Sequence, residues 1–357
     1  MKKTLILLSL LTSSLIFAQG IDQSLYVFDF EFDEMPIPER AKTLAEKGFS
    51  GVTFGIRNKK DLQKFKDYLN TEEVKTGKLS IPIVYIAYAF GRKDVLDPIW
   101  KEALTLNKNM PLWVIVTNRD SLATKEKTLK LFDEMTKEAA KQNSDIVIYP
   151  HDNTLIECVD DALPYIEALK KDNLKLTLHL SHEMRAGKAD QLLKVALRAA
   201  PYMTFASISG SDVTMRPNSD ADWSDAIKPL DQGDFNTEQF VMVLQKIKFK
   251  GKTVLHTFGI KQNKSHLDRS LQVWNNLVNK TYTDLNEKTD VILDNPENAY
   301  WDKGSKSWFI SSLGGEEVTI AEDGYGWITK IDENGNIVSN RWIEGLDAPT
   351  GMASYNS

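Results

Sequence analysis

Short, almost continuous apolar runs recur along the first 260 or so residues, and amphipathic stretches with helical spacing separate many of them. The expected strands cover residues 25–30, 51–55, 81–88, 112–116, 145–149, 174–180, 203–208 and 253–258. The expected helices cover 38–46, 60–69, 124–141, 159–170, 189–200 and 267–278. Because apolar runs of this length are typical of strands buried on both faces, the pattern favours a parallel sheet covered by helices.

The number and order of these strands predict an α/β fold of the (β/α)₈ TIM-barrel type, expected to span residues 20–284. Eight strand–helix units in about 260 residues match the size of such a barrel. A doubly wound open sheet is the alternative. No Gly-x-Gly-x-x-Gly follows the first strand, so a Rossmann dinucleotide site has no support.

From residue 285 to 357 the chain is rich in Gly, Trp, Asn and Asp and contains shorter strand-like pieces. These pieces cover 307–310, 326–331 and 336–338, and the turn at 332–336 indicates a hairpin. We therefore expect a short antiparallel β-meander, about one propeller blade in size, with no second copy in the chain.

The first 19 residues have the pattern of a secretory signal peptide. Lys2 and Lys3 precede an apolar stretch at 5–17, and Ala18-Gln19 resembles a cleavage site. The stretch is too short to span a bilayer as a stable anchor, although an uncleaved anchor is the alternative. The mature protein is thus expected to be secreted or periplasmic, with no membrane attachment after cleavage.

Composition narrows the possible partners. The 357 residues carry a net charge of −6 and are 26% charged, which is typical of a globular protein. No run of Lys and Arg stands out, so a nucleic-acid partner is not expected. The single cysteine, Cys158, excludes an intrachain disulfide and a Cys-based zinc or iron–sulfur site, and we expect it to be buried. None of these features specifies an oligomeric state.

Four of the five histidines fall at or just beyond the expected carboxyl ends of strands, where barrel enzymes place their chemistry. This set comprises His151, His179, His182 and His256. Imidazole serves as a metal ligand or as an acid–base group near neutral pH, and a hydrogen-bonded structural role is the alternative for each. His179 and His182 can converge only if the chain turns just after Leu180. His266 begins the last helix and is expected to be solvated.

Carboxylates form a second constellation near the same strand ends. They are Asp29, Glu31 and Asp33 after the first strand, Asp212 after the seventh, and Asp231 and Asp234 further along. Such groups bind sugar hydroxyls, act as bases or join a metal, whereas turn formation and helix capping are the alternatives. Lys261, after the eighth strand, can supply positive charge to a substrate oxygen. The aromatic rings expected either to stack on a sugar or to belong to the core are those of Tyr88, Phe90, Trp223 and Phe258.

Together, the order and spacing of several segments resemble the xylose isomerase-like barrel superfamily, often labelled sugar phosphate isomerase/epimerase. The resemblance covers about residues 22–280 and rests on 48–52, 149–151, 176–182, 207–212, 227–235, 259–260 and 267–274. Members commonly bind a divalent metal through Glu, Asp, His and Glu at strand ends. At the matching positions this chain has His151, His179 and His256, with Ser207 or Ser209 on strand seven. The resemblance therefore implies either a His-held divalent metal, zinc or manganese, or a metal-free site.

The tail resembles the opening of a gluconolactonase-type β-propeller, in segments 293–302, 311–315, 323–332 and 345–352. Enzymes of that family bind a divalent cation and hydrolyse lactones. A propeller needs several blades, so a site of that kind would be incomplete in one blade.

The sequence thus predicts a secreted carbohydrate-active barrel that isomerises, epimerises or eliminates by removing a proton next to a sugar carbonyl. The residues expected to be catalytic are His151, His182, Asp212 and Lys261, and the possible metal set is His151, His179, His182 and His256. The alternatives are a non-catalytic sugar-binding module and a lactone hydrolase that is truncated in this chain. In each case the partner is a small carbohydrate or a related molecule.

Overall fold

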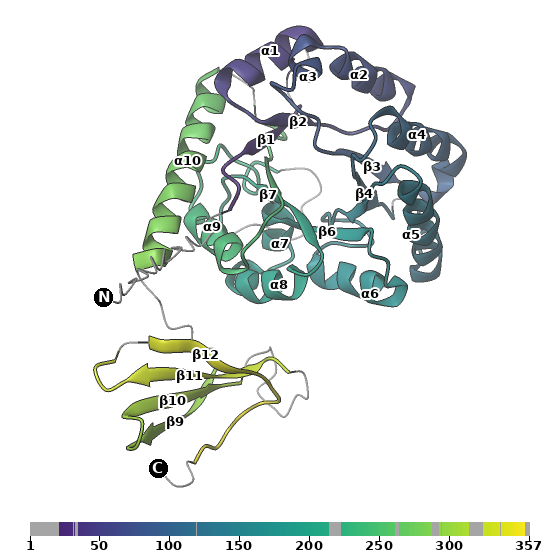
Figure 1. The fold of residues 1–357 in the computed structure, drawn as a ribbon. Coiled ribbons are helices and arrows are strands. Elements are labelled where there is room, and N and C mark those ends of the chain that lie inside the picture. Colours follow the sequence, from purple (N-terminus) through teal and green to yellow (C-terminus); the bar gives the residue numbers. More distant parts are fainter. Residues whose placement is uncertain are drawn as a thin grey trace, which may run out of the picture.

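The computed structural model describes residues 21–30, 32, 35–118, 120–213, 223–260, 264–287, 293, 295–313, 324–335 and 337–353. The expected signal peptide at 1–19 lies outside these residues, as do Glu31, Asp33 and Lys261. Within them the chain forms one eight-stranded and one four-stranded sheet (Figure 1).

The larger sheet is a parallel barrel. Its strands are β1 (Leu25–Phe28), β2 (Gly51–Thr53), β3 (Val84–Tyr88), β4 (Leu112–Val116), β5 (Ile146–Ile148), β6 (Leu174–His179), β7 (Met203–Ile208) and β8 (Lys252–Leu255). They follow the order β2-β1-β8-β7-β6-β5-β4-β3. The pairing of β1 with β8 brings the first and last strands side by side, as closure requires. The expected (β/α)₈ barrel is confirmed, and the open doubly wound sheet is excluded.

The seam between β2 and β3 is joined by two isolated bridges, Gly51 to Ser80 and Gly55 to Tyr85. Both glycines permit a close approach. A Cβ at Gly51 would collide with the Ser80 carbonyl, and one at Gly55 would collide with the Tyr85 ring. Small residues are therefore needed where the barrel closes.

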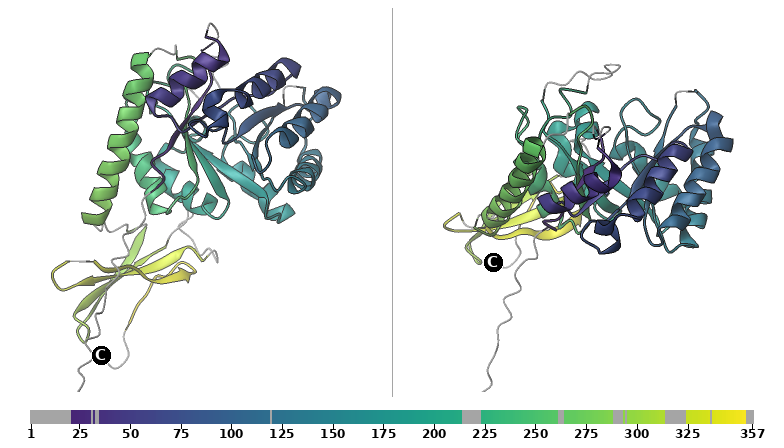
Figure 2. Two further views of the ribbon diagram at one scale, coloured as in Figure 1. Left: turned by 45° about the horizontal axis from the view of Figure 1, so that its top comes forward. Right: turned by 90° about the horizontal axis from the view of Figure 1, so that it is seen from above.

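The helices are arranged around the barrel, most of them on its outer side (Figures 1 and 2). They are α1 (Ile37–Lys47), α2 (Lys59–Leu69), α3 (Glu72–Lys75), α4 (Lys93–Leu106), α5 (Lys125–Ala140), α6 (Val159–Leu169), α7 (Leu180–Arg185), α8 (Leu192–Ala199), α9 (Thr237–Lys246) and α10 (Lys264–Glu287). The sequence pattern missed α3, α4, α7 and α9. In α4, Pro98 lies inside the helix, where a proline usually signals an end. No helix in the described ranges is both long and apolar enough to cross a membrane.

Side-chain alternation along the strands separates two apolar clusters. The barrel interior holds Tyr26, Phe28, Ile83, Trp113, Ile115, Val147, Tyr149, Phe205 and Val254. The alternate residues belong to a larger cluster that also contains the buried helix residues. His179 lies two residues after Thr177, whose hydroxyl contacts Trp113, and His256 lies two residues after Val254. Both histidines therefore follow the inward register of their strands.

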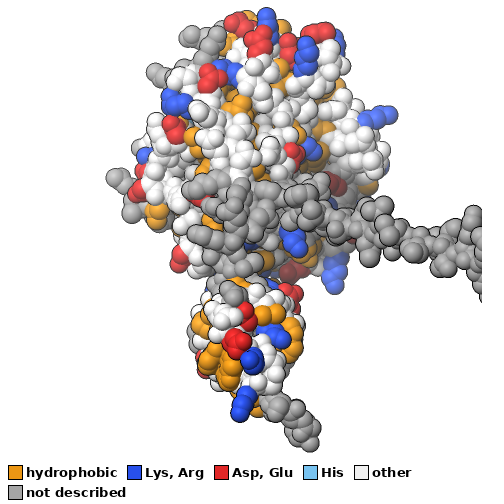
Figure 3. All heavy atoms as spheres, turned by 60° about the vertical axis from the view of Figure 1, so that its left-hand side comes forward, with side chains coloured by type: hydrophobic (Ala, Val, Ile, Leu, Met, Phe, Trp, Pro, Cys, Tyr) orange, Lys and Arg blue, Asp and Glu red, His pale blue; other side chains and the backbone are white. Residues whose placement is uncertain are grey.

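The smaller sheet is antiparallel, with the order β12-β11-β10-β9. It consists of β9 (Pro296–Asp302), β10 (Ser307–Ser312), β11 (Gly326–Asp332) and β12 (Ile337–Leu346). The expected β-meander is confirmed, and β9 is a strand that the pattern missed. The expected boundary at residue 284 falls within α10. The exposed large apolar side chains of this sheet include Trp308, Val338, Trp342 and Ile343. Figure 3 shows hydrophobic side chains on the surface of the part of the chain that forms this sheet.

Candidate functional site

Four imidazole rings converge at the carboxyl ends of the barrel strands. The ring of His182 lies between those of His151 and His179, with centroids 4.2 and 4.1 Å away. The ring of His256 lies 5.0 Å from that of His179. Helix α7 begins at Leu180, directly after β6 ends. This turn brings His182 back over His179. The two histidines thus converge because the chain turns at Leu180, as the sequence required.

Aromatic side chains enclose the four rings. Tyr149 stacks on His179 with 5.0 Å between centroids, and Phe28 lies 4.6 Å from His256. On another side, Trp223 packs against His151 and His182. Three of the histidines are buried as a result, and only His151 is half-buried.

Burial makes the three inner rings poor bases. It lowers the pKa of His179 and His182 well below the ordinary value, and the neighbouring imidazoles add to the effect. Burial, with a contribution from His151, lowers the pKa of His256 to about 3. A charged imidazolium is disfavoured in such surroundings, so these three rings are neutral at pH 7.

Backbone hydrogen bonds define the tautomers of His182 and His256. The Asp152 N–H donates to Nδ1 of His182 at 3.3 Å, and the Phe258 N–H donates to Nδ1 of His256 at 3.4 Å. A backbone N–H can only donate, so each Nδ1 must carry a lone pair. In a neutral ring the proton then lies on Nε2, which becomes a hydrogen-bond donor.

His151 has the opposite tautomer. Its Nδ1 lies 2.7 Å from the backbone carbonyl of Asp152, and a carbonyl can only accept. Nδ1 therefore carries the proton, and Nε2 of the neutral ring carries the basic lone pair. The N–H of Asp152 thus orients His182, and its carbonyl orients His151.

The donor chemistry of the cluster does not fit the divalent metal that the resemblance implies. A metal-bound histidine almost always donates its second ring N–H to an acceptor. In His182 and His256 the second nitrogen accepts a hydrogen bond instead. Across the described residues, no group of three or more His, Cys, Asp or Glu is arranged to hold a metal ion. This hydrogen-bond direction argues against a metal bound through Nε2 of His182 or His256, and the expected metal set of His151, His179, His182 and His256 stays a prediction.

A buried ion pair that the sequence reading missed supports the cluster. Nε of Arg185 donates to a carboxylate oxygen of Asp152 at 2.9 Å, and the two side chains are 0% and 4% exposed. The Arg185 guanidinium also lies 4.2 Å from the centroid of the Trp223 ring. The sequence contained one indication that Arg185 lies near the cluster. It follows His182 by three residues and therefore lies on the same side of α7.

Glu183, also on α7, is a second buried group that sequence reasoning missed. It accepts a 2.7 Å hydrogen bond from the N–H of Val159, the first residue of α6. Burial raises the pKa of its carboxyl to about 8. The group is therefore largely protonated at neutral pH and connects α7 to α6.

The expected carboxylates have other partners. Asp29 is buried and paired with Arg40, Lys64 and Tyr68, so it is a structural residue. Asp212 pairs with Lys228 at 2.7 Å and accepts a hydrogen bond from the Asp234 N–H. A catalytic role for Asp212 therefore stays a prediction, as does that of Lys261, which lies outside the described residues.

Asp231 pairs with Arg269, and Asp234 accepts a hydrogen bond from the backbone of Val213. These two loop carboxylates are thus engaged with their own surroundings rather than with the imidazole cluster.

The aromatic residues that were expected either to stack on a sugar or to belong to the core have different surroundings. Trp223 contacts the cluster, whereas Tyr88 is a core residue that donates to Asp97. Phe90 packs on Tyr88, and the exposed Phe258 ring packs on Phe30. The expectation that His266 is solvated is wrong, because it is 2% exposed and its Nδ1 lies 3.3 Å from Ser270 Oγ.

Cys158 is buried, as expected. Burial raises the pKa of its thiol to about 12, so it is not a nucleophile at neutral pH.

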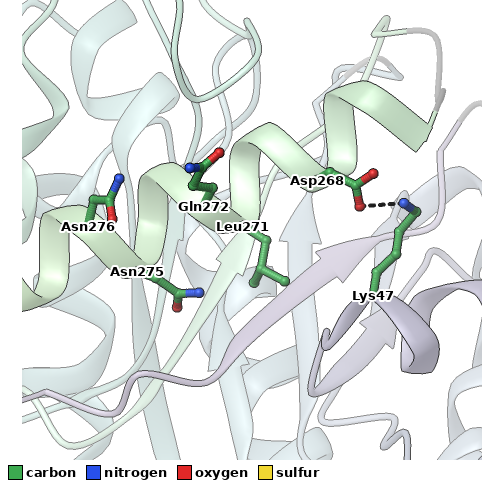
Figure 4. A pocket seen from close by; sticks show the side chains of 6 residues that line it. All are labelled: Lys47, Asp268, Leu271, Gln272, Asn275 and Asn276. Carbon is green, nitrogen blue, oxygen red and sulfur yellow. Dashed lines mark hydrogen bonds and ion pairs between the residues drawn. The ribbon is translucent and has the colours of Figure 1, made fainter.

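A hollow of about 350 Å³ lies on the outer surface beside α10 (Figure 4). Its lining residues are Lys47, Asp268, Leu271, Gln272, Asn275 and Asn276. Lys47 and Asp268 form an ion pair across it. It contains no histidine and is separate from the imidazole cluster.

Similar solved structures support the fold. A xylose isomerase domain containing protein from Salmonella typhimurium is 13% identical with a TM-score of 0.57, over 73% of this chain and 99% of that one. L-Ribulose 3-epimerase is 11% identical with a TM-score of 0.54, over 74% and 96%. The IOLI protein with a bound zinc atom is 14% identical with a TM-score of 0.52, over 75% and 100%. At these identities the likeness shows the fold alone.

Sequence comparison supplies the family. No curated protein matches the sequence. The family model described as xylose isomerase-like TIM barrel matches residues 41–277, which is most of the barrel. This match agrees with the expectation of an enzyme. It ends before the small sheet, so the resemblance of the tail to a gluconolactonase-type propeller stays a prediction. The chain belongs to the xylose isomerase-like TIM barrel family.

Proposed function

We propose that this chain isomerises or epimerises a small sugar by moving a proton at the carbon next to a carbonyl. The family and the fold shared with L-ribulose 3-epimerase support this class of reaction. The observation that carries the proposal is the tautomer of His151, whose hydrogen bond to the Asp152 carbonyl leaves Nε2 as a base.

The half-buried position of His151 suits this role, because the other three rings are more deeply enclosed. In the proposed step, Nε2 takes the proton from carbon and the C–H electron pair forms the enolate. The resulting imidazolium keeps its Nδ1–H bond to Asp152. Delivery of this proton by the imidazolium to the neighbouring carbon, with transfer of the hydroxyl proton to the enolate oxygen, gives isomerisation. Delivery of a solvent proton to the opposite face of the same carbon, with loss of the imidazolium proton to solvent, gives epimerisation. The same first step would also begin an elimination.

The proposal includes export of the enzyme, because residues 1–19 have the pattern of a cleaved signal. N-terminal sequencing of the protein released by the expressing cell tests this part. A mature chain that begins near residue 20 supports export. A chain that retains residues 1–19 contradicts it.

Deuterium exchange tests the chemistry directly. Mature protein is incubated with a panel of ketopentoses and ketohexoses in D₂O. Proton NMR then follows loss of the C–H signal next to the carbonyl and formation of the isomer. His151→Asn keeps an N–H that can donate to the Asp152 carbonyl but removes the base. We expect exchange to fall about 10²–10⁴-fold in this variant.

The matched control is His266→Asn, which alters a buried histidine outside the cluster and should keep its exchange rate per folded molecule. Wild-type exchange in His151→Asn would remove His151 from the mechanism. A wild-type protein that binds ketoses without exchanging any would instead be a sugar-binding module.

A further inference from the structure

The geometry points to a metal-free site in which the Nε2–H groups of His182 and His256 donate to the substrate carbonyl oxygen, in the place of the divalent metal. This inference rests on the proposed function, because it assigns the group that receives the negative charge of the enolate. The two donors are the N–H groups of two neutral rings, and a backbone hydrogen bond to Nδ1 orients each ring.

The first support is an unsatisfied donor at the centre of the cluster. Nε2 of His182 is fully buried and has no hydrogen-bond partner among the described residues. The same holds for Nε2 of His179, whose Nδ1 lies 3.1 Å from Ser181 Oγ. Buried polar atoms in proteins are nearly always hydrogen-bonded, so an orphan donor requires an explanation. An oxygen acceptor on a bound molecule supplies one.

The second support is the direction of the hydrogen bonds at Nδ1. If Nε2 of His182 bound a metal, Nδ1 would have to carry the proton and would face the Asp152 N–H, a second donor. The same conflict arises between His256 and the Phe258 N–H. Both rings are therefore suited to donate from Nε2 and unsuited to coordinate through it.

The third support is the enclosure. The aromatic rings of Tyr149, Phe28 and Trp223 surround the imidazoles, and hydrogen bonds to a developing oxyanion are strongest where water is excluded. A neutral imidazole is an effective electrophile toward a carbonyl oxygen. The first step balances without a metal, because His151 takes the carbon-bound proton while the two Nε2–H groups stabilise the enolate oxygen.

Asp152 is the positioning residue in this arrangement. Its N–H and carbonyl give His182 and His151 opposite tautomers, which are those needed by a donor and a base. The ion pair with Arg185 holds its side chain in place. The backbone of one residue thus sets the tautomer of the donor, His182, and that of the base, His151.

The tautomers can be measured without turnover. The full-length mature protein is labelled with ¹⁵N-histidine and studied by ¹H–¹⁵N NMR, in EDTA and again with zinc chloride. We expect an Nε2–H tautomer for His182 and His256 and an Nδ1–H tautomer for His151, unchanged by either addition. Stoichiometric zinc binding that shifts the His182 and His256 nitrogens would overturn the inference.

A pair of substitutions separates a donor from a ligand. His182→Gln places an amide N–H near the position of Nε2, whereas His182→Leu has a similar size and no donor. A donor role predicts that exchange falls about 10²–10³-fold in the Leu variant. In the Gln variant it should fall only about 10–10²-fold. Equal loss in both variants, together with zinc dependence of the wild type, would overturn the inference.

These tests distinguish a failure of the metal-free site from a failure of the proposed isomerase or epimerase function. Exchange that requires zinc overturns the metal-free site and leaves the isomerase or epimerase reaction intact. Absence of exchange with every ketose overturns the reaction. In that case the His182 Nε2–H resonance decides the inference: a shift on adding D-fructose supports it, and no shift overturns it.

Discussion

Two buried polar clusters lie at the carboxyl end of the barrel strands, and they differ in how their polar atoms are satisfied. In the first, after β1, Asp29 accepts from Arg40 at 3.1 Å, Lys64 at 2.7 Å and Tyr68 at 2.8 Å. In the second, after β5, β6 and β8, Nε2 of His179 and Nε2 of His182 have no hydrogen-bond partner in the described part of the chain. The first cluster is complete within the protein, whereas the second has donor atoms left for a ligand.

The difference follows from charge. Asp29 forms ion pairs with Arg40 and Lys64, and a buried charge requires partners on the protein itself. The inner imidazoles are neutral, so leaving a nitrogen unsatisfied costs only the smaller penalty of a neutral group. At so buried a position, neutral histidines can therefore leave hydrogen-bonding atoms unsatisfied for a ligand more readily than carboxylates can.

Removing the charge of the first cluster should have the largest effect on stability. Asp29→Ala leaves the Arg40 charge buried without its carboxylate, and we expect a loss of about 3–5 kcal/mol in the free energy of unfolding. Urea denaturation measures this loss, and exchange per folded molecule should stay near the wild-type rate. Lys42→Ala, which breaks an exposed pair with Glu46, is the control and should cost less than about 1 kcal/mol. Large loss of exchange in folded Asp29→Ala would show that the two clusters are coupled.

The neutral rings of the second cluster should make stability fall in acid. The folded pKa of His256 is about 3, against 6.5 for the free side chain, so only the unfolded chain gains this proton as the pH falls below about 6.5. Its contribution is complete above 6.5 and is lost at about 1.4 kcal/mol per pH unit toward 3. His256→Gln should remove that part of the slope. An unchanged slope between pH 6.5 and 4.5 would mean that His256 is protonated in the folded state.

Glu183 should give a slope of the opposite sign. Its folded pKa is about 8 and its ordinary value is 4.5, so the folded state holds a proton that the unfolded state has lost. The stabilisation is complete below 4.5 and disappears as the pH rises through 8, by at most about 1.4 kcal/mol per unit. Between pH 6.5 and 8 the histidine contribution is constant, so this window isolates Glu183. Glu183→Gln should flatten the curve there, and a curve like that of the wild type would contradict the assignment.

Much of the barrel could be predicted because its strands are apolar on both faces. Residues 112–116 and 203–208 were expected as strands and form β4 and β7 with the same bounds. Helix α4 was missed because Pro98 lies inside it, and α7 because it follows β6 without a loop. Local patterns therefore indicated the sheet better than its connections.

The membership of the histidine cluster was also foreseeable, since four histidines follow strand ends. Their tautomers were not, because these depend on the N–H and carbonyl groups of Asp152 and on the Phe258 N–H. The structural role of Asp29 was equally hidden, because Tyr68 lies 39 residues away in the chain. Residue types thus indicated the place of the site, and hydrogen-bond direction was needed to indicate its chemistry.

The most direct test of the account is the rate of deuterium exchange into a ketose by the chelator-treated mature protein, measured with and without added zinc. The account predicts the same rate in both conditions, with nearly all of it lost in His151→Asn. An absence of exchange in EDTA that zinc restores would contradict it.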